Sequence, residues 1–399
     1  MNKISRLSFA CCLALALSIW PAALTYADAQ DTFNAIAGID WQHDDNLFRL
    51  PSSSVTTSKR ADEVKSGYAG IRIDKLYALQ HFRVYYTHTA YRYQNNHNLN
   101  FDTNEYQAAW LWALTPYLTG NLSTERAEGR DTSQDINGLN VFNVRRTENN
   151  RLDADWSPYS NWHLLTGLSH YKLSNSQQAN AVSDYTQKSI YGGVRYVFGS
   201  GSAMSLITTG RKGSYDRRAL IATSINDTGF GERELDASLN WILTAKSRLN
   251  LVAGYVSRDY DNFKQRNYDE PFGSAEYVWA PTSKLQISAI TARQITGYES
   301  VNSSFTVRDS LGVTPRWAIT DKIALLGNAS IANRKFRGSG IAGTVDREDT
   351  EKNASVSINW TPWRYVTLGA NLQRSTRGST LPGIDYKDTT AGVSAQLFF

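Results

Sequence analysis

Eight short turn motifs divide the chain into segments of nearly equal length. Successive motifs lie about forty residues apart, which is the length of two strands, one tight turn and one longer loop of a membrane barrel. The motifs occupy residues 74–76, 115–117, 157–161, 199–202, 244–247, 280–283, 319–322 and 361–363. One further strand at each end of this series gives a total of about eighteen strands. The sequence therefore predicts an all-β protein, a transmembrane, antiparallel, up-and-down β-barrel.

Alternation of residue type predicts strands with two different faces. Val393, Leu397 and Phe399 fall on one face of the last segment, and glycine and polar residues fall on the other. In a bilayer the apolar face must contact lipid, so the polar face must line the interior. The same alternation occurs in residues 151–156, 234–241 and 353–360, whereas Ile290 interrupts it in residues 285–294.

The final segment also resembles the closing strand of bacterial outer-membrane barrels. The resemblance implies that Phe399, together with Leu397, forms part of the signal that the barrel assembly machinery reads. A strand that closes the barrel would pair with the first strand, which we place at residues 33–44.

Large side chains stand immediately before the turns and predict a girdle at one membrane interface. They are Ile73, Leu114, Trp156, Phe198, Trp241, Trp279, Trp317 and Trp360. A soluble propeller has a similar repeat length, but each of its blades needs four strands where this chain shows two. The pattern therefore favours the barrel.

The N-terminus has the features of a secretory signal. Lys3 and Arg6 precede an apolar stretch at residues 7–20 that is too short to span a bilayer. Residues 1–27 are expected to be removed, which leaves residues 28–399 as one barrel in the outer membrane, with both ends in the periplasm. Cleavage lowers the basic count from 42 to 40 against 37 acidic residues, so the charge balance gives no support to a nucleic-acid partner.

Charged and aromatic residues on the inward face are the candidate solute path. Opposed charges across a lumen create a transverse field that favours polar solutes, and tyrosine rings can stack on sugars. The expected path residues are Arg83, Tyr85, Tyr91, Tyr191, Arg195, Arg258, Glu276, Arg308 and Arg316. The alternative is that such groups only pair with one another along the wall.

Other motifs indicate no catalytic residue, metal or cofactor. Residues 338–343 match a glycine-rich dinucleotide fingerprint, but no helix follows them. Residues 43–45 offer a histidine and two carboxylates without a nucleophile elbow. Residues 131–138 lack the glycine and closing glutamate of a calcium loop. The long polar loop 127–145 is the expected constriction if the protein is an uptake porin.

Residues 39–49, with the core Asp44-Asp45-Asn46-Leu47-Phe48-Arg49, resemble the opening strand of an outer-membrane barrel family of exopolysaccharide operons, including those linked to exosortase-type (PEP-CTERM) systems. The resemblance implies a non-enzymatic channel for exopolysaccharide export, with the polymer, outer-membrane lipid and periplasmic export proteins as partners. A general or sugar-uptake porin is the first alternative. A barrel enzyme acting on lipid or polysaccharide at the cell surface is the second.

Overall fold

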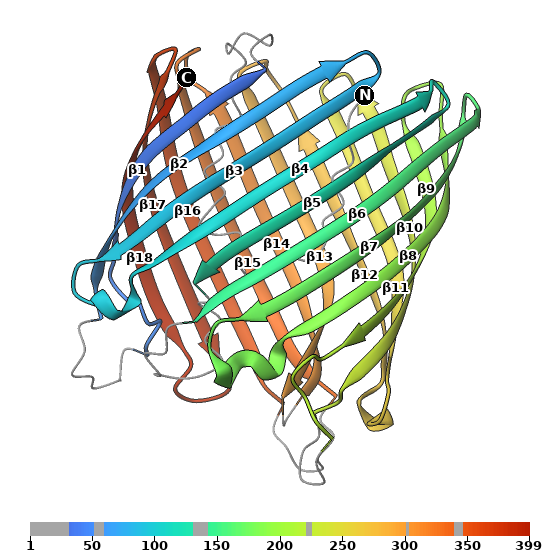
Figure 1. Cartoon of the computed structure of the whole chain (residues 1–399). Coiled ribbons are helices and arrows are strands. Elements are labelled where there is room, and N and C mark those ends of the chain that lie inside the picture. Colours follow the sequence, from blue (N-terminus) through green and yellow to red (C-terminus); the bar gives the residue numbers. More distant parts are fainter. Residues whose placement is uncertain (1–31, 52–59, 131–142, 221–225, 301–302, 339–345) are drawn as a thin grey trace.

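The computed structural model describes residues 32–51, 60–130, 143–220, 226–300, 303–338 and 346–399. Eighteen antiparallel strands form one closed sheet in which each strand pairs with its neighbours in the sequence, and β1 pairs with β18 (Figure 1). No helix in this described part of the chain is long and apolar enough to cross a membrane. The strands are β1 (Phe33–Asp44), β2 (Asp62–Tyr77), β3 (Gln80–Tyr93), β4 (Phe101–Thr115), β5 (Leu118–Arg130), β6 (Val144–Tyr159), β7 (Trp162–Asn175), β8 (Tyr185–Val197), β9 (Ala203–Ser214), β10 (Gly229–Thr244), β11 (Ser247–Tyr260), β12 (Tyr268–Trp279), β13 (Leu285–Ser300), β14 (Ser303–Ala318), β15 (Ile323–Arg337), β16 (Glu348–Trp363), β17 (Val366–Ser379) and β18 (Tyr386–Phe398).

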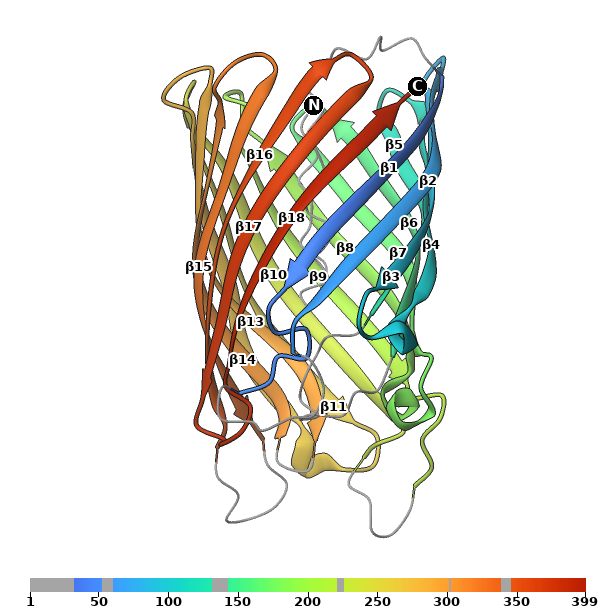
Figure 2. The same ribbon diagram turned by 90° about the vertical axis from the view of Figure 1, so that its left-hand side faces the viewer.

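The barrel has two unlike ends, as the turn series predicted. The eight tight turns gather at one end, which we call the turn end, and the longer connections gather at the other, which we call the loop end (Figure 1). Among the described residues, short 3-10 helices lie in three of the long connections, namely η1 (His97–Leu99), η2 (Gln178–Ser183) and η3 (Lys264–Arg266). β1 begins and β18 ends at the turn end, where they lie side by side (Figure 2).

The outward face is apolar in the predicted registers. Leu235 is 52% exposed and Trp241 is 49% exposed, although both are large hydrophobic residues on regular strands. Trp156, Trp279 and Trp360 are also exposed just before their turns. An aqueous setting would penalise this continuous apolar surface, whereas lipid stabilises it.

The seam between β1 and β18 closes the sheet along its whole length. Nine residue pairs run from Ile36↔Phe398 to Asp44↔Thr390. At the turn end, Phe399 exchanges two backbone hydrogen bonds with Ala35, each 2.9 Å long. A barrel closed in this way leaves no strand edge in the apolar region, where each unpaired backbone group would cost several kcal/mol.

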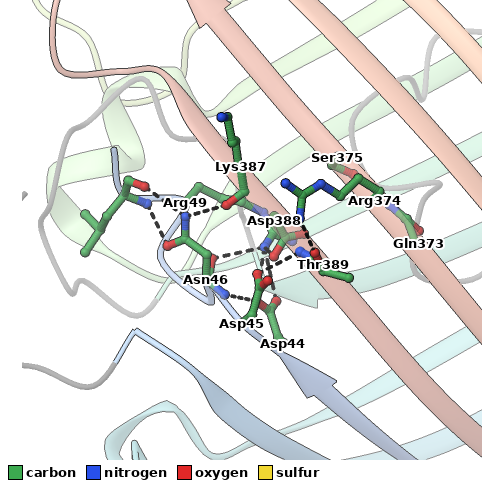
Figure 3. A network of polar contacts seen from close by, with 11 residues as sticks. Asp44, Asp45, Asn46, Arg49, Gln373, Arg374, Ser375, Lys387, Asp388 and Thr389 are labelled. Carbon is green, nitrogen blue, oxygen red and sulfur yellow. Dashed lines mark hydrogen bonds and ion pairs between the residues drawn. The ribbon is translucent and has the colours of Figure 1, made fainter. Parts of the chain in front are cut away.

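A network of polar side chains fastens the same seam at the loop end (Figure 3). The Asn46 amide donates to the carbonyls of Leu50 and Lys387, at 2.8 and 2.9 Å. The Arg49 guanidinium pairs with Asp44 and with Asp388, whose side chain is fully buried. Arg49 has a φ of 53°, an uncommon left-handed conformation, so these contacts also hold strained backbone. The 44–49 motif thus acts as a latch between the first and last strands.

The ladder between β12 and β13 is interrupted before the loop end, and the shorter gap between β4 and β5 begins beyond Tyr106↔Arg126. β12 and β13 pair only from Trp279↔Ile287 to Gly273↔Arg293. Beyond that point, in the described chain, residues 268–272 stay paired with β11, while β13 stays paired with β14 as far as Ser300↔Ser303. Pro271 lies in the interrupted stretch and has no N–H to offer to a ladder.

Candidate solute path

The nine predicted path residues all lie on inward-facing strand positions. Arg83, Tyr85 and Tyr91 alternate along β3 with outward Phe82 and Tyr86, which are exposed. Tyr191 and Arg195 lie on β8, and Arg258 and Glu276 lie on β11 and β12. Arg308 and Arg316 share the inward face of β14. The structure distributes these residues around the lumen and does not bring them into one site.

Two of them are tied into pairs along the wall of β6–β8. The Tyr191 hydroxyl donates to Asp153 at 2.6 Å, and the Arg151 guanidinium pairs with the same carboxylate at 2.6 Å. Arg195 pairs with Asp155 at 3.2 Å, and His163 contacts that carboxylate at 2.7 Å. The contacts on this wall fit the alternative to a solute path, in which the charged groups of the lumen pair with one another.

Arg258 belongs to a buried cluster on β9–β11. Its guanidinium lies 2.6 Å from Glu232 and 3.9 Å from the centre of the Phe230 ring, and its side chain is 12% exposed. Arg211 contacts both Glu232 and Glu234, at 2.8 and 2.6 Å. Glu276, on β12, instead accepts hydrogen bonds from Asn250 and Ser288. Arg258 is therefore a packed residue that water in the lumen scarcely reaches.

Basic side chains exceed acidic ones on β14–β16. The guanidiniums of Arg308 and Arg334 share one carboxylate, Glu351, at 3.5 and 3.4 Å. All three side chains are about one-fifth exposed, so water reaches them. Arg316 lies on the same face of β14, nearer the turn end. This arc of the wall carries a positive charge surplus.

Our sequence reasoning missed Glu232 and Glu351 as partners of these arginines. Both follow the same alternation as the residues that we did identify, since Glu232 precedes Glu234 by two positions and Glu351 precedes Asn353 by two. Extending each register to the loop end of its strand would have found them.

The ends of β13 and β14 lean into the barrel beyond the interrupted ladder. A Cβ atom on Gly297 would lie 2.1 Å from a terminal nitrogen of Arg258, which points inward from β11. The rings of Phe305 on β14 and Tyr268 on β12 stack with their centres 4.5 Å apart. Residues of β13 and β14 that the alternation along each strand assigns to the outward face therefore lie against the inward face of β11 and β12. We call residues 294–298 and 303–307 the inward hairpin.

The loop 127–145, the predicted constriction of an uptake porin, falls mostly on residues 131–142, which lie outside the described residues, while its flanks belong to β5 and β6. The calcium-like stretch 131–138 also lies outside the described residues. Residues 339–343 of the glycine-rich motif lie outside the described residues as well, and so does the expected signal at residues 1–27.

A crevice of about 640 Å³ accompanies the wall interruption. It lies between the inward face of β12, which contributes Phe272, and the outward face of β13–β15, which contributes Thr291, Leu311 and Ile331. An ion pair between Arg293 and Asp309 lines its polar part, with nitrogen–oxygen distances of 2.7 and 3.0 Å.

Within the part of the chain that the structure describes, the carboxylates of the seam latch are the group whose geometry comes nearest to that of a metal site. Ligand atoms of Asp44, Asp45 and Asp388 lie within 4.8 Å of one another. The positive charge of Arg49 already neutralises part of this cluster, and the Asp45 carboxylate accepts the backbone N–H of Thr389 at 2.7 Å. These contacts describe a structural clamp between strands. The histidine and carboxylates at residues 43–45 accordingly mark the junction of β1 with its loop.

Comparisons with known proteins match the chain to porins. A family model described as putative beta-barrel porin 2 matches residues 172–399, more than half of the chain, from the end of β7 through β18. No curated protein matches. Similar solved structures include a BenF-like porin from Pseudomonas fluorescens Pf-5, at TM-score 0.55 and 9% identity, covering 92% of this chain and 99% of that one. Two others, from Pseudomonas aeruginosa, are OccK2 (OpdF) in complex with glucuronate and OpdK with vanillate. Each has a TM-score of 0.52 and 9% identity and covers 92% of this chain, with 98% and 99% of its own length covered.

Proposed function

The chain belongs to the putative beta-barrel porin 2 family and is a porin-like outer-membrane barrel; from that premise we propose that it is a passive, non-enzymatic channel for small polar solutes that favours anions. In this proposal the long loops face the cell exterior and both termini face the periplasm, as in other bacterial barrels. The proposal is the uptake-porin alternative of the sequence analysis, which the comparisons support better than export.

The observation that carries this proposal is the surplus of positive charge on β14–β16, where two arginines share one carboxylate. Arg308, Arg334 and Glu351 together have a net charge of +1, and they face the lumen. Glu105 and Glu125 face the lumen from β4 and β5. β5 and β14 are nine strands apart in either direction around the eighteen-strand ring, so the two groups lie on opposite walls. The resulting transverse field orients polar solutes, and its positive wall attracts anions.

Small carboxylates are the solutes that this arrangement fits best. Guanidinium groups hold carboxylates with charge-assisted hydrogen bonds, often two at a time. Glu351 already occupies such a position between Arg308 and Arg334, so a solute carboxylate would compete with it for the two guanidiniums. The similar barrels OccK2 and OpdK are described with glucuronate and vanillate. These titles concern those proteins, and they support testing the same class of solute here.

Solute uptake into liposomes tests the proposal directly. Vesicles containing the purified protein should take up glucuronate faster than glucose, which is similar in size and uncharged. Arg308→Gln should reduce that preference, because Arg334 and Glu351 then form a neutral pair. Arg374→Gln is the matched control, since Arg374 is exposed on the outward face of β17. Equal rates for the two solutes would contradict the anion preference, and a preference that survives Arg308→Gln would contradict its origin in the arginines around Glu351.

The exopolysaccharide hypothesis rests on the resemblance of residues 39–49, whose polar core forms the seam latch. A structural role accounts for those residues without a polymer path. The two functions differ in a strain that lacks the gene. Loss of small-carboxylate uptake with normal polymer secretion would support the porin. Polymer that accumulates inside the cell, with normal uptake of small carboxylates, would support export.

A further inference from the structure

We propose that the inward hairpin is the size-limiting element of the channel and that Arg258 and Gly297 position it inside the wall. This inference rests on the proposed channel function. It concerns residues 294–298 of β13 and 303–307 of β14, which leave the line of the wall where the β12–β13 ladder stops.

Opposed faces of the sheet meet at this hairpin. Along β13 and β14, odd-numbered residues point outward, as exposed Leu311 and Trp317 show. Ile295 and Phe305 continue that alternation, yet both are buried in one hydrophobic cluster with Val256 and Phe230, which face inward from β11 and β10. Outward residues can be covered by inward residues only if the hairpin has passed to the lumen side of β10–β12.

Polar contacts fix the hairpin in that position. The Tyr260 hydroxyl donates to the carbonyl of Ser304 at 3.4 Å, and the Arg266 guanidinium donates to the carbonyl of Ser303 at 3.2 Å. Tyr260 and Arg266 are almost fully buried. Because an apolar cluster and these hydrogen bonds act together, the hairpin is a packed part of the lumen wall and narrows the loop end.

Gly297 allows the close approach. Its missing side chain leaves room for the Arg258 guanidinium, which Glu232 and the Phe230 ring hold in place. A side chain at position 297 would have to displace that buried guanidinium from its ion pair. The hairpin would then move toward the lipid-facing side, which would widen the lumen and fill the crevice beside β12.

Single-channel recording of glycine variants tests the inference. Gly297→Val should raise the conductance on the order of two-fold, because conductance follows the width of the narrowest part of a pore. Gly192→Val is the matched control, since Gly192 also lies within a strand and no atom lies within 4 Å of a Cβ built there. Its conductance should equal that of the wild type. Heat-modifiable migration on gels establishes that each barrel is folded.

A second pair of variants decides the matter if Gly297→Val fails to fold. Phe305→Ala removes the stacking on Tyr268 and should also raise conductance and admit larger neutral sugars into liposomes. Phe305→Tyr keeps the ring and should conduct as the wild type does. Folded Phe305→Ala protein with unchanged conductance and unchanged solute cut-off would overturn the inference. A wild-type protein without any conductance would instead overturn the proposed function.

Discussion

Replacing Arg49 with alanine tests whether the 44–49 motif is a latch. Arg49 contacts Asp44 at 3.1 Å and also pairs with Asp388, whose side chain is fully buried. Removing the guanidinium would leave two buried carboxylates without their common counter-charge. We expect Arg49→Ala to destabilise the barrel and to do so by opening the β1–β18 seam at the loop end.

The burial of the three side chains sets the size of the effect. Breaking a buried ion pair by removing one partner costs about 3–5 kcal/mol, because an uncompensated charge remains. Asp388 is 0% exposed, but Arg49 is 20% exposed, so water screens part of the interaction. We therefore expect a loss of about 3 kcal/mol in the free energy of unfolding. Adding Asp388→Asn should recover about half or more of that loss, because it removes the stranded charge.

Reversible urea unfolding in lipid vesicles, followed by tryptophan fluorescence, measures these free energies. Arg374→Ala is the control, because Arg374 lies nearby but is exposed, and it should change the unfolding free energy by about 0.5 kcal/mol or less. An Arg49→Ala protein within about 1 kcal/mol of the wild type would refute the latch. So would a double variant less stable than Arg49→Ala, since removal of a stranded charge cannot destabilise the fold.

Three further results are expected. Burial disfavours the charged form of Asp227, in the loop before β10, but hydrogen bonds from Asn262 and from backbone amides outweigh burial and hold its pKa below the usual value. A lowered folded-state pKa stabilises the fold above the unfolded pKa of about 3.9, and this stability is lost as pH falls through the folded value. Asp227→Asn should therefore be less stable than the wild type in urea at neutral pH, and the gap should narrow at about pH 3; a gap that does not change with pH would contradict this. Deleting Phe399 should lower the amount of folded barrel in outer-membrane fractions, because two backbone hydrogen bonds to Ala35 are lost, and normal amounts would contradict its closing role. Replacing Arg195 and Arg316 together with alanine should change single-channel conductance while the strand content in circular dichroism stays the same; unchanged conductance would show that these arginines lie off the solute path. Arg258 is left out of that pair because its burial against Glu232 makes it a packing residue.

The strand count and the lipid-facing surface could be predicted because both follow from local pattern. Tight turns such as 115–117 and 361–363 have their own residue signature, and alternation assigns Leu235 and Trp241 to lipid without any knowledge of the neighbouring strands. These features depend on residues close together in the sequence, so a single sequence contains them.

The inward hairpin could not be predicted, because distant contacts create it. Ile290 signalled that β13 is irregular, but the displacement depends on Gly297 fitting against Arg258, 39 residues earlier in the chain. The latch has the same character. Residues 44–49 were recognisable as a motif, whereas the partner carbonyl of Asn46 lies 341 residues away at Lys387. The side chains of such sites converge only after the barrel has closed.

Ion selectivity in a planar bilayer tests the central claim most directly. Purified protein would be inserted between unequal potassium chloride solutions, and the voltage at which the current vanishes would be measured. The surplus of guanidinium groups around Glu351 predicts a conducting channel whose reversal potential is displaced from zero toward the equilibrium potential of chloride. In Arg308→Gln the reversal potential should shift back toward zero. A cation-selective reversal potential, or a folded barrel that carries no current, would contradict the account.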